Sequence, residues 1–80
     1  MSKYHPLKIY LEKSRNDKLI LTLKEIEKIL GSELPPSAIK YQQWWANKRG
    51  HTQANAWLGA GWKVDYIDIV NKFVTFIKLP

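Results

Sequence analysis

All four tryptophans of this 80-residue chain fall in one segment, residues 41–62, which reads YQQWWANKRGHTQANAWLGAGW. A chain of this length buries only about 60% of the surface that its unfolded form exposes, so its large aromatic side chains have to supply the core first. We therefore expect the fold to be built around this segment, with Tyr41, Trp45, Trp57 and Trp62 facing inward.

The N-terminal part of the chain predicts a helix followed by a strand. In YHPLKIYLEK, a proline suits the first helical turn, and Leu7, Tyr10 and Leu11 recur at the spacing of one buried helical stripe. The sequence KLILT is short and rich in branched residues, which predicts a strand over residues 18–22.

A second helix is predicted by the sequence LTLKEIEKILG. Thr22 and Glu25 have the spacing of a capping box, in which each side chain accepts a hydrogen bond from the backbone of the other residue. Ile26 lies on the stripe that should be buried, and Gly31 suits the left-handed position after a helix. The helix should therefore run between Thr22 and Gly31.

The tryptophan-rich segment predicts a third and a fourth helix. The third should run from residue 36 or 37 to about Asn47 and end before Gly50, and Thr52 should cap the fourth. At 100° per residue the third helix has an inner face and a polar face. The inner face carries Ala38, Tyr41 and Trp45, the polar face carries Lys40, Gln43, Trp44 and Asn47, and the fourth helix turns Ala54, Trp57 and Leu58 inward.

Two strands, WKVDYIDIV and FVTFIKL, complete the chain as a hairpin with a two-residue turn at Asn71–Lys72. The apolar alternation of the first strand shifts by one residue near positions 66–67, which indicates a bulge. The chain therefore predicts one α+β domain, residues 1–80, with helices on a short three-stranded antiparallel sheet. Its element order is also that of a small winged helix-turn-helix domain.

The charge of the chain is concentrated in the same central segment. Thirteen Lys and Arg residues oppose seven Asp and Glu residues, for a net charge of +6. Residues 34–64 contain Lys40, Lys48, Arg49 and Lys63 but no acid. A basic surface of this kind suits phosphate contacts, which position a protein on nucleic acid without reading its sequence. The alternative to phosphate binding is structural: Lys and Arg at the C-terminal end of a helix interact favourably with the helix dipole.

Polar and aromatic residues within this segment extend the candidate surface. Asn and Gln amides can bind the edge of adenine, and an exposed indole can stack on a base. The alternatives are amides that are merely solvated and an indole that shields the edge of the core. The candidate nucleic-acid-binding residues are Lys40, Gln43, Trp44, Asn47, Lys48, Arg49, His51, Gln53 and Lys63.

Nearly the whole chain resembles a family of small uncharacterised domains from bacteria, archaea and phages. The residues that carry the resemblance are YHPLKIYL, LTLKEIEKILGSELPPSA, YQQWWANKRGHTQANAWLGAGWKVD and VTF. Members of that family are found alone and beside nuclease-type domains. The resemblance implies an accessory module that faces nucleic acid, and it brings no catalytic residues.

Catalysis, cofactors and membrane insertion are not expected. The serines lie outside any nucleophile-elbow sequence, GAGW follows a helix where a phosphate loop would follow a strand, and no His and carboxylate spacing indicates zinc. The absence of cysteine excludes disulfides and thiolate ligands. No apolar run reaches the roughly 18–20 residues of a membrane span, and no signal peptide is evident, so we expect a cytoplasmic protein.

Two functions follow from these features. The first is a non-catalytic module that binds nucleic acid, with duplex DNA favoured, through the acid-free segment 40–63. The second is a small protein-interaction or inhibitor protein of phage or plasmid type, which would dock on an acidic partner with Trp44 as its anchor. A monomer and a homodimer are compatible with both.

Overall fold

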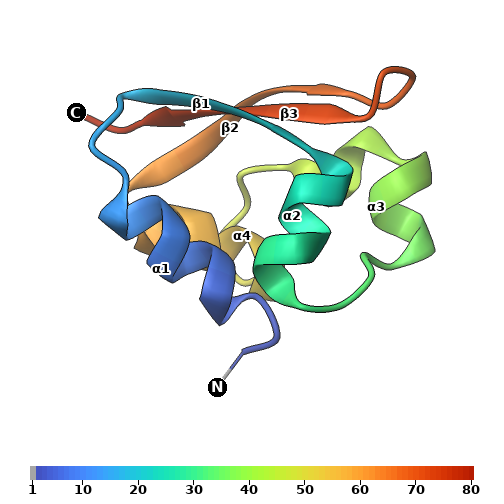
Figure 1. Ribbon diagram of the computed structural model, residues 1–80, viewed down its shortest axis with the longest axis horizontal. Helices are drawn as coiled ribbons and strands as arrows, with labels where there is room; N and C mark the ends of the chain where they lie inside the picture. The colour runs from blue at the N-terminus through green and yellow to red at the C-terminus, as the bar shows by residue number, and fades with distance from the viewer. Residues whose placement is uncertain (1) are drawn as a thin grey trace.

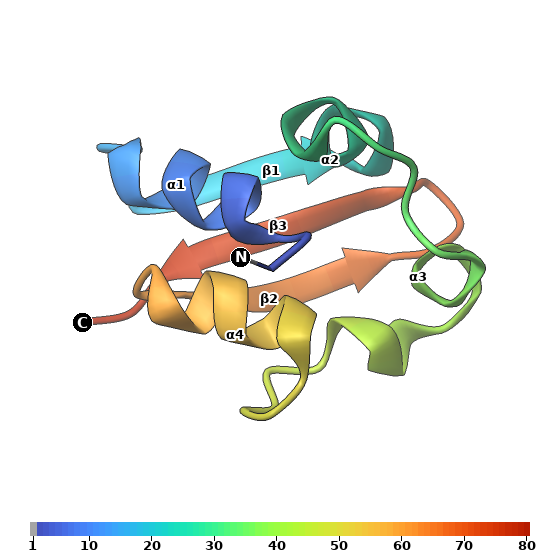
Figure 2. The ribbon, with the colours of Figure 1, turned by 90° about the horizontal axis from the view of Figure 1, so that it is seen from below.

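A three-stranded antiparallel sheet carries all the helices on one of its faces in the computed structural model, which describes residues 2–80 (Figures 1 and 2). The α+β class predicted from the sequence is confirmed. In chain order the elements are α1 (His5–Lys13), β1 (Lys18–Thr22), α2 (Leu23–Leu30), α3 (Pro36–Lys40), the 3₁₀ helix η1 (Gln42–Trp45), α4 (Thr52–Gly59), β2 (Trp62–Asp68) and β3 (Phe73–Lys78).

The strand order is β1-β3-β2, so the C-terminal strand lies in the middle of the sheet. Val74 and Phe76 of this central strand are fully buried beneath the helices. The opposite face of the sheet is not covered by any helix of residues 2–80 (Figure 1). Ile20 and Tyr66, which flank Thr75 in the register, are both more than half exposed there.

The hairpin between β2 and β3 differs from the predicted two-residue turn. The strands end at Asp68 and resume at Phe73, so four residues connect them. The Asp68 carboxylate accepts hydrogen bonds from the backbone and the side-chain N–H groups of Asn71 at 2.8 and 3.0 Å, and these bonds close the loop early. The same bonds lower the pKa of Asp68 below its usual value. The predicted bulge is present, one residue earlier, between Val64 and Tyr66.

The predicted capping box of α2 is confirmed. The Thr22 hydroxyl accepts a hydrogen bond from the Glu25 backbone at 3.0 Å, and the Glu25 carboxylate accepts one from the Thr22 backbone at 2.8 Å. Gly31 ends the helix in the left-handed conformation, with φ of 74°. In α1 the predicted stripe is only partly correct, because Leu7 and Leu11 are buried but Tyr10 is 42% exposed.

The helix predicted from residue 36 or 37 to about Asn47 begins as expected at Pro36 but ends at Lys40, so its predicted second half is wrong. The chain leaves the α-helical conformation at Tyr41, where φ is −123° and ψ is 124°, and resumes as the single turn η1. The cause is the Trp45 indole, which donates a hydrogen bond of 2.9 Å to the Ala38 carbonyl, a group that a continuing helix would have used itself. Tyr41 consequently faces solvent, 54% exposed, and does not join the core as we had expected.

An aromatic cluster fills the space between the helices and the sheet. The indoles of Trp45 and Trp57 stack at a centroid distance of 5.8 Å, and Trp57 meets Phe76 of the sheet edge to face at 5.9 Å. On the other side Trp44 packs against Trp45 at 4.6 Å and against Tyr4 at 5.7 Å. The cluster therefore extends from the sheet to the surface, where half-buried Trp44 forms its outer end.

Candidate functional site

The loop between η1 and α4, residues 46–51, is fixed to the sheet by one side chain. Asn47 accepts hydrogen bonds from the Trp57 indole and from the Val64 backbone, at 2.9 and 2.8 Å. Its amide also donates a hydrogen bond of 2.8 Å to the Val64 carbonyl. Asn47 therefore occupies the free edge of β2 as a neighbouring strand would.

This arrangement changes the role of Asn47. The sequence placed its amide among groups that could bind a base edge, or else in a helix cap. In the structure both its oxygen and its nitrogen are used inside the protein. We therefore assign Asn47 to the architecture of the site and leave it out of the binding surface. No local sequence signal indicates this role, because Val64 lies 17 residues away.

Four of the candidate residues line one cavity of about 330 Å³, which we call the aromatic cavity. It is formed where α3, η1 and the start of α4 meet, and no acidic residue lines it. Its volume is at the lower end of the range of small-molecule sites. The lining residues are Ser37, Tyr41, Gln43, Trp44, His51 and Gln53.

The Trp44 side of the aromatic cavity is held in place by its neighbours. Tyr4 and Trp45 both contact the Trp44 ring edge to face. The Gln53 amide donates a hydrogen bond of 3.1 Å to the Trp44 carbonyl, which joins η1 to α4. Burial raises the pKa of Tyr4 above its usual value. The Trp44 ring is thus held in one position by its neighbours.

Basic residues border the aromatic cavity along the chain. Lys40 directly precedes Tyr41, and Lys48 and Arg49 lie in the loop that ends at His51. All three basic side chains are exposed. His51 occupies the N-cap position of α4, where we had expected Thr52, and its side chain makes no capping bond. The imidazole of His51 therefore lines the cavity without a structural task at the helix start.

Lys63 is separated from this group. It alternates in β2 with Trp62 and Val64, which are both buried beneath the helices. Successive strand residues point to opposite faces of a sheet, so Lys63 belongs to the uncovered face. The acid-free segment is thus continuous in sequence but divided in space, because Lys63 lies on the uncovered face of the sheet whereas the aromatic cavity is lined by residues of α3, η1 and α4 and of the segments that join them.

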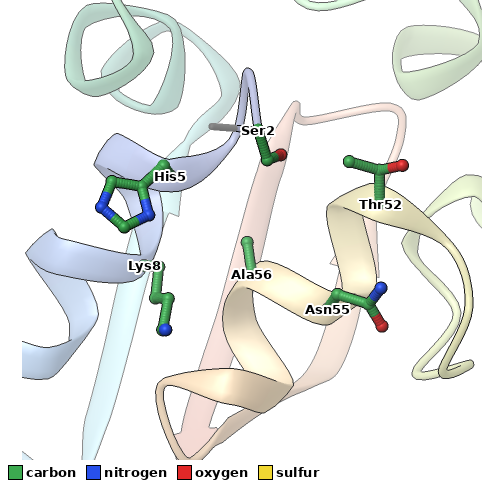
Figure 3. Close-up of a pocket in the computed structure, with 6 residues that line it drawn as sticks. All are labelled: Ser2, His5, Lys8, Thr52, Asn55 and Ala56. Atoms are coloured by element: carbon green, nitrogen blue, oxygen red, sulfur yellow. The ribbon is translucent and has the colours of Figure 1, made fainter.

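Two further cavities border the same region but have different chemistry. One, of about 230 Å³, lies between α1 and α4 (Figure 3) and its lining, which includes His5, Lys8 and Asn55, has no Trp, Tyr or Phe. The other follows β2 beside η1 and includes the carboxylate of Asp65. Among these three cavities, only the aromatic cavity has two large aromatic rings and no acidic residue in its lining.

Within residues 2–80, no three His, Asp or Glu side chains gather as a set that could hold a metal ion. Over the same residues, no helix has the length and apolar character needed to cross a membrane.

Comparisons with known proteins place the chain in a family without supplying a function. No curated protein and no solved structure matched it. A family model does match over residues 4–79, almost the entire chain. This match agrees with the resemblance to a small uncharacterised domain that the sequence indicated. The chain belongs to the family described as a domain of unknown function, DUF7662.

Proposed function

We propose that this chain is a non-catalytic nucleic-acid-binding module. The observation that supports the proposal is the aromatic cavity, whose lining lacks acids. The exposed residues Lys40, Lys48 and Arg49 lie close to its lining residues in the sequence. Lysine and arginine contact phosphates, and aromatic rings stack on bases. Both kinds of contact occur together in proteins that hold single-stranded nucleic acid without a strict sequence preference.

Duplex DNA is the ligand we propose for the phosphate contacts. It carries one negative charge for every ~1.7 Å of helix axis, which is a higher density than that of a single strand. Lys40, Lys48 and Arg49 would meet its backbone and fix the position of the module. Because each contact releases counterions, the affinity should fall steeply as the salt concentration rises.

A winged-helix mode of docking belongs to this proposal. The strand order and the C-terminal hairpin support it, and Lys72 in the hairpin loop would contact the backbone as part of a wing. The break at Tyr41 leaves α3 with only five residues, too few to fill a groove. The basic loop and the first turn of α4 would therefore approach the DNA in place of a long recognition helix.

The test is the binding of labelled random-sequence duplex DNA, followed by fluorescence anisotropy at low and at near-physiological salt. Wild-type protein should bind with a steep salt dependence, and the double variant Lys48→Glu/Arg49→Glu should lose affinity by roughly tenfold or more. The matched control is Lys24→Glu/Lys28→Glu, which makes the same change of charge at exposed positions of α2. That helix packs beside β1, at the opposite edge of the sheet from α4.

Equal losses in the two double variants would show that only net charge matters and that the proposed face is wrong. Absence of binding at low salt would remove the nucleic-acid proposal altogether.

A second candidate function is a module that docks on an acidic protein surface. The observation in its favour is Trp44, a half-buried indole in the same segment as the exposed Arg49, since Trp and Arg are enriched among residues that dominate protein interfaces. Binding to a protein partner that is insensitive to salt, together with no DNA binding, would favour this function. Homodimer formation is compatible with both candidates.

A further inference from the structure

We propose that the aromatic cavity holds one unpaired nucleobase, so that the module prefers gapped or single-stranded DNA to an intact duplex. This inference rests on the proposed nucleic-acid binding and adds the state of the strand that the same site selects. It follows from three features of the cavity: its concave shape, its fixed and exposed aromatic rings, and the polar groups that share its lining.

The first feature is the position of the rings inside a hollow. A base within a duplex exposes only its edges in the grooves, because its two faces are covered by the neighbouring base pairs. The rings of Tyr41 and Trp44 line an open hollow of about 330 Å³ at the surface. A base can reach them face on only after it has left the stack.

The second feature is the difference between the two rings. Trp44 is half-buried and fixed by Tyr4, Trp45 and the Gln53 hydrogen bond, so little conformational freedom is lost when a base stacks on it. Tyr41 is 54% exposed, and a base that covers it removes apolar surface from water. The two rings together therefore supply stacking at a small cost in entropy.

The third feature is the supply of hydrogen-bonding groups around the rings. Ser37, Gln43 and His51 are exposed polar residues of the lining. The Gln53 amide nitrogen is used by the Trp44 carbonyl, which leaves its oxygen as an acceptor. These groups can satisfy the edge of a base that has lost its pairing partner, and side-chain amides adapt to donors and acceptors alike. We therefore expect weak discrimination among the four bases.

The experiment compares three fluorescein-labelled DNA ligands of equal length: an intact duplex, a duplex with a central gap of a few nucleotides, and a single strand. Stacking of one base should make the affinity for the gapped duplex roughly tenfold higher than for the intact one. The variant Tyr41→Ala should reduce the preference for the gapped duplex over the intact duplex to about twofold or less.

Tyr66→Ala is the matched control. Tyr66 is 55% exposed, almost the same as Tyr41, but it lies on the uncovered face of the sheet. The control variant should keep the full preference for gapped DNA. Loss of preference in both variants, or in neither, would overturn the assignment of the cavity.

Tryptophan emission gives a second readout with unlabelled gapped DNA. Trp45, Trp57 and Trp62 are at most 2% exposed, so a bound base can touch only Trp44 among the four indoles. Gapped DNA should quench the emission, and Trp44→Phe should remove most of the quenching.

The outcomes separate this inference from the proposed function. Equal affinity for intact and gapped duplexes, with a loss on charge reversal at Lys48 and Arg49, would overturn the base pocket and leave nucleic-acid binding in place. No binding to any of the three ligands at low salt would overturn both.

Discussion

The three fully buried tryptophans differ in the hydrogen bonding of one atom, the indole nitrogen. In Trp45 it donates to the Ala38 carbonyl and in Trp57 to the Asn47 side chain, each at 2.9 Å. In Trp62 the nitrogen is buried and has no partner among residues 2–80. A buried donor without an acceptor costs about 1–3 kcal/mol. Trp62 therefore stabilises the core by packing and by the contact of its ring with the Lys78 ammonium, 5.6 Å from the ring centroid, but not by a hydrogen bond.

This difference predicts the order of two substitutions. Trp57→Phe and Trp62→Phe leave cavities of similar size, but only the first breaks a hydrogen bond and only the second removes an unsatisfied donor. Trp62→Phe should reduce the free energy of unfolding by about 1–3 kcal/mol less than Trp57→Phe. Urea denaturation of the two variants measures the difference. An equal or larger loss for Trp62→Phe would show that packing outweighs the orphan donor.

For individual residues, the sequence predicted burial better than it predicted hydrogen-bond partners. Trp45, Trp57 and Trp62 are core residues as expected. The positions of Tyr41 and Asn47 could not be read from helical periodicity. Each depends on a contact of another residue: the Trp45 indole for Tyr41, and the Val64 backbone for Asn47.

The helices end in different ways, and the glycines near their ends have different tasks. Gly31 follows α2 with φ of 74°, a conformation that disfavours any side chain. Gly59 is the last residue of α4, and a Cβ atom there would lie 3.5 Å from the Lys8 side chain, at ordinary contact distance. The same chemical change should therefore have opposite effects at the two positions.

Gly31→Ala should lower the free energy of unfolding by about 1–2 kcal/mol because alanine is strained in the left-handed region. Gly59→Ala should raise it by about 0.4–1 kcal/mol because alanine has less freedom to lose when the helix forms. Thermal unfolding monitored by circular dichroism compares them directly, and each variant serves as the control for the other. A stabilising Gly31→Ala would contradict the conformation of the α2 cap.

Elements whose signals are local were predicted well. The α2 capping box needs only residues three apart, and the structure contains it as expected. The break after α3 was missed because Trp45 must fold back over seven residues to reach Ala38, and tertiary packing decides whether it does so. Consequently Tyr41 was wrongly assigned to the inner face, although Ala38 and Trp45 are buried as expected. In α4, Ala54 and Trp57 are buried as predicted.

Asn47 acts at the scale of the whole molecule, because it joins the basic loop, α4 and β2 through three hydrogen bonds. Asn47→Ala should reduce the free energy of unfolding by about 2–4 kcal/mol, since the buried Trp57 donor and the Val64 backbone lose their partners together. Urea denaturation measures the loss.

Asn55→Ala provides the comparison for this substitution. Asn55 is an exposed residue that accepts one hydrogen bond, of 3.1 Å, from the Gly50 backbone. Its replacement should cost about 0.5–1.5 kcal/mol. If Asn47→Ala cost no more than this, the three bonds would not hold the molecule together.

The α+β class could be predicted from the order of the helices and strands and from the spacing of their apolar residues. The candidate site could not be predicted from a continuous stretch of sequence. Residues 40–63 form one acid-free run, but the fold divides it. His51 and Gln53 meet Trp44 in the aromatic cavity, while Lys63 lies on the other face of the sheet. Only the packing of α3, η1 and α4 decides which members of such a run share a surface.

The Asn47 side chain also has a consequence for how copies of this chain meet one another. An exposed edge strand invites another chain to extend the sheet, and long flat edges of this kind promote aggregation. Along β2 the Val64 backbone groups are already occupied by Asn47, and the bulge after Val64 interrupts the edge beyond them. Asn47, which holds the basic loop in place, therefore also keeps the Val64 backbone from pairing with a strand of another copy. It acts there beside the charged side chains of Lys63 and Asp65, which also disfavour pairing at an edge strand.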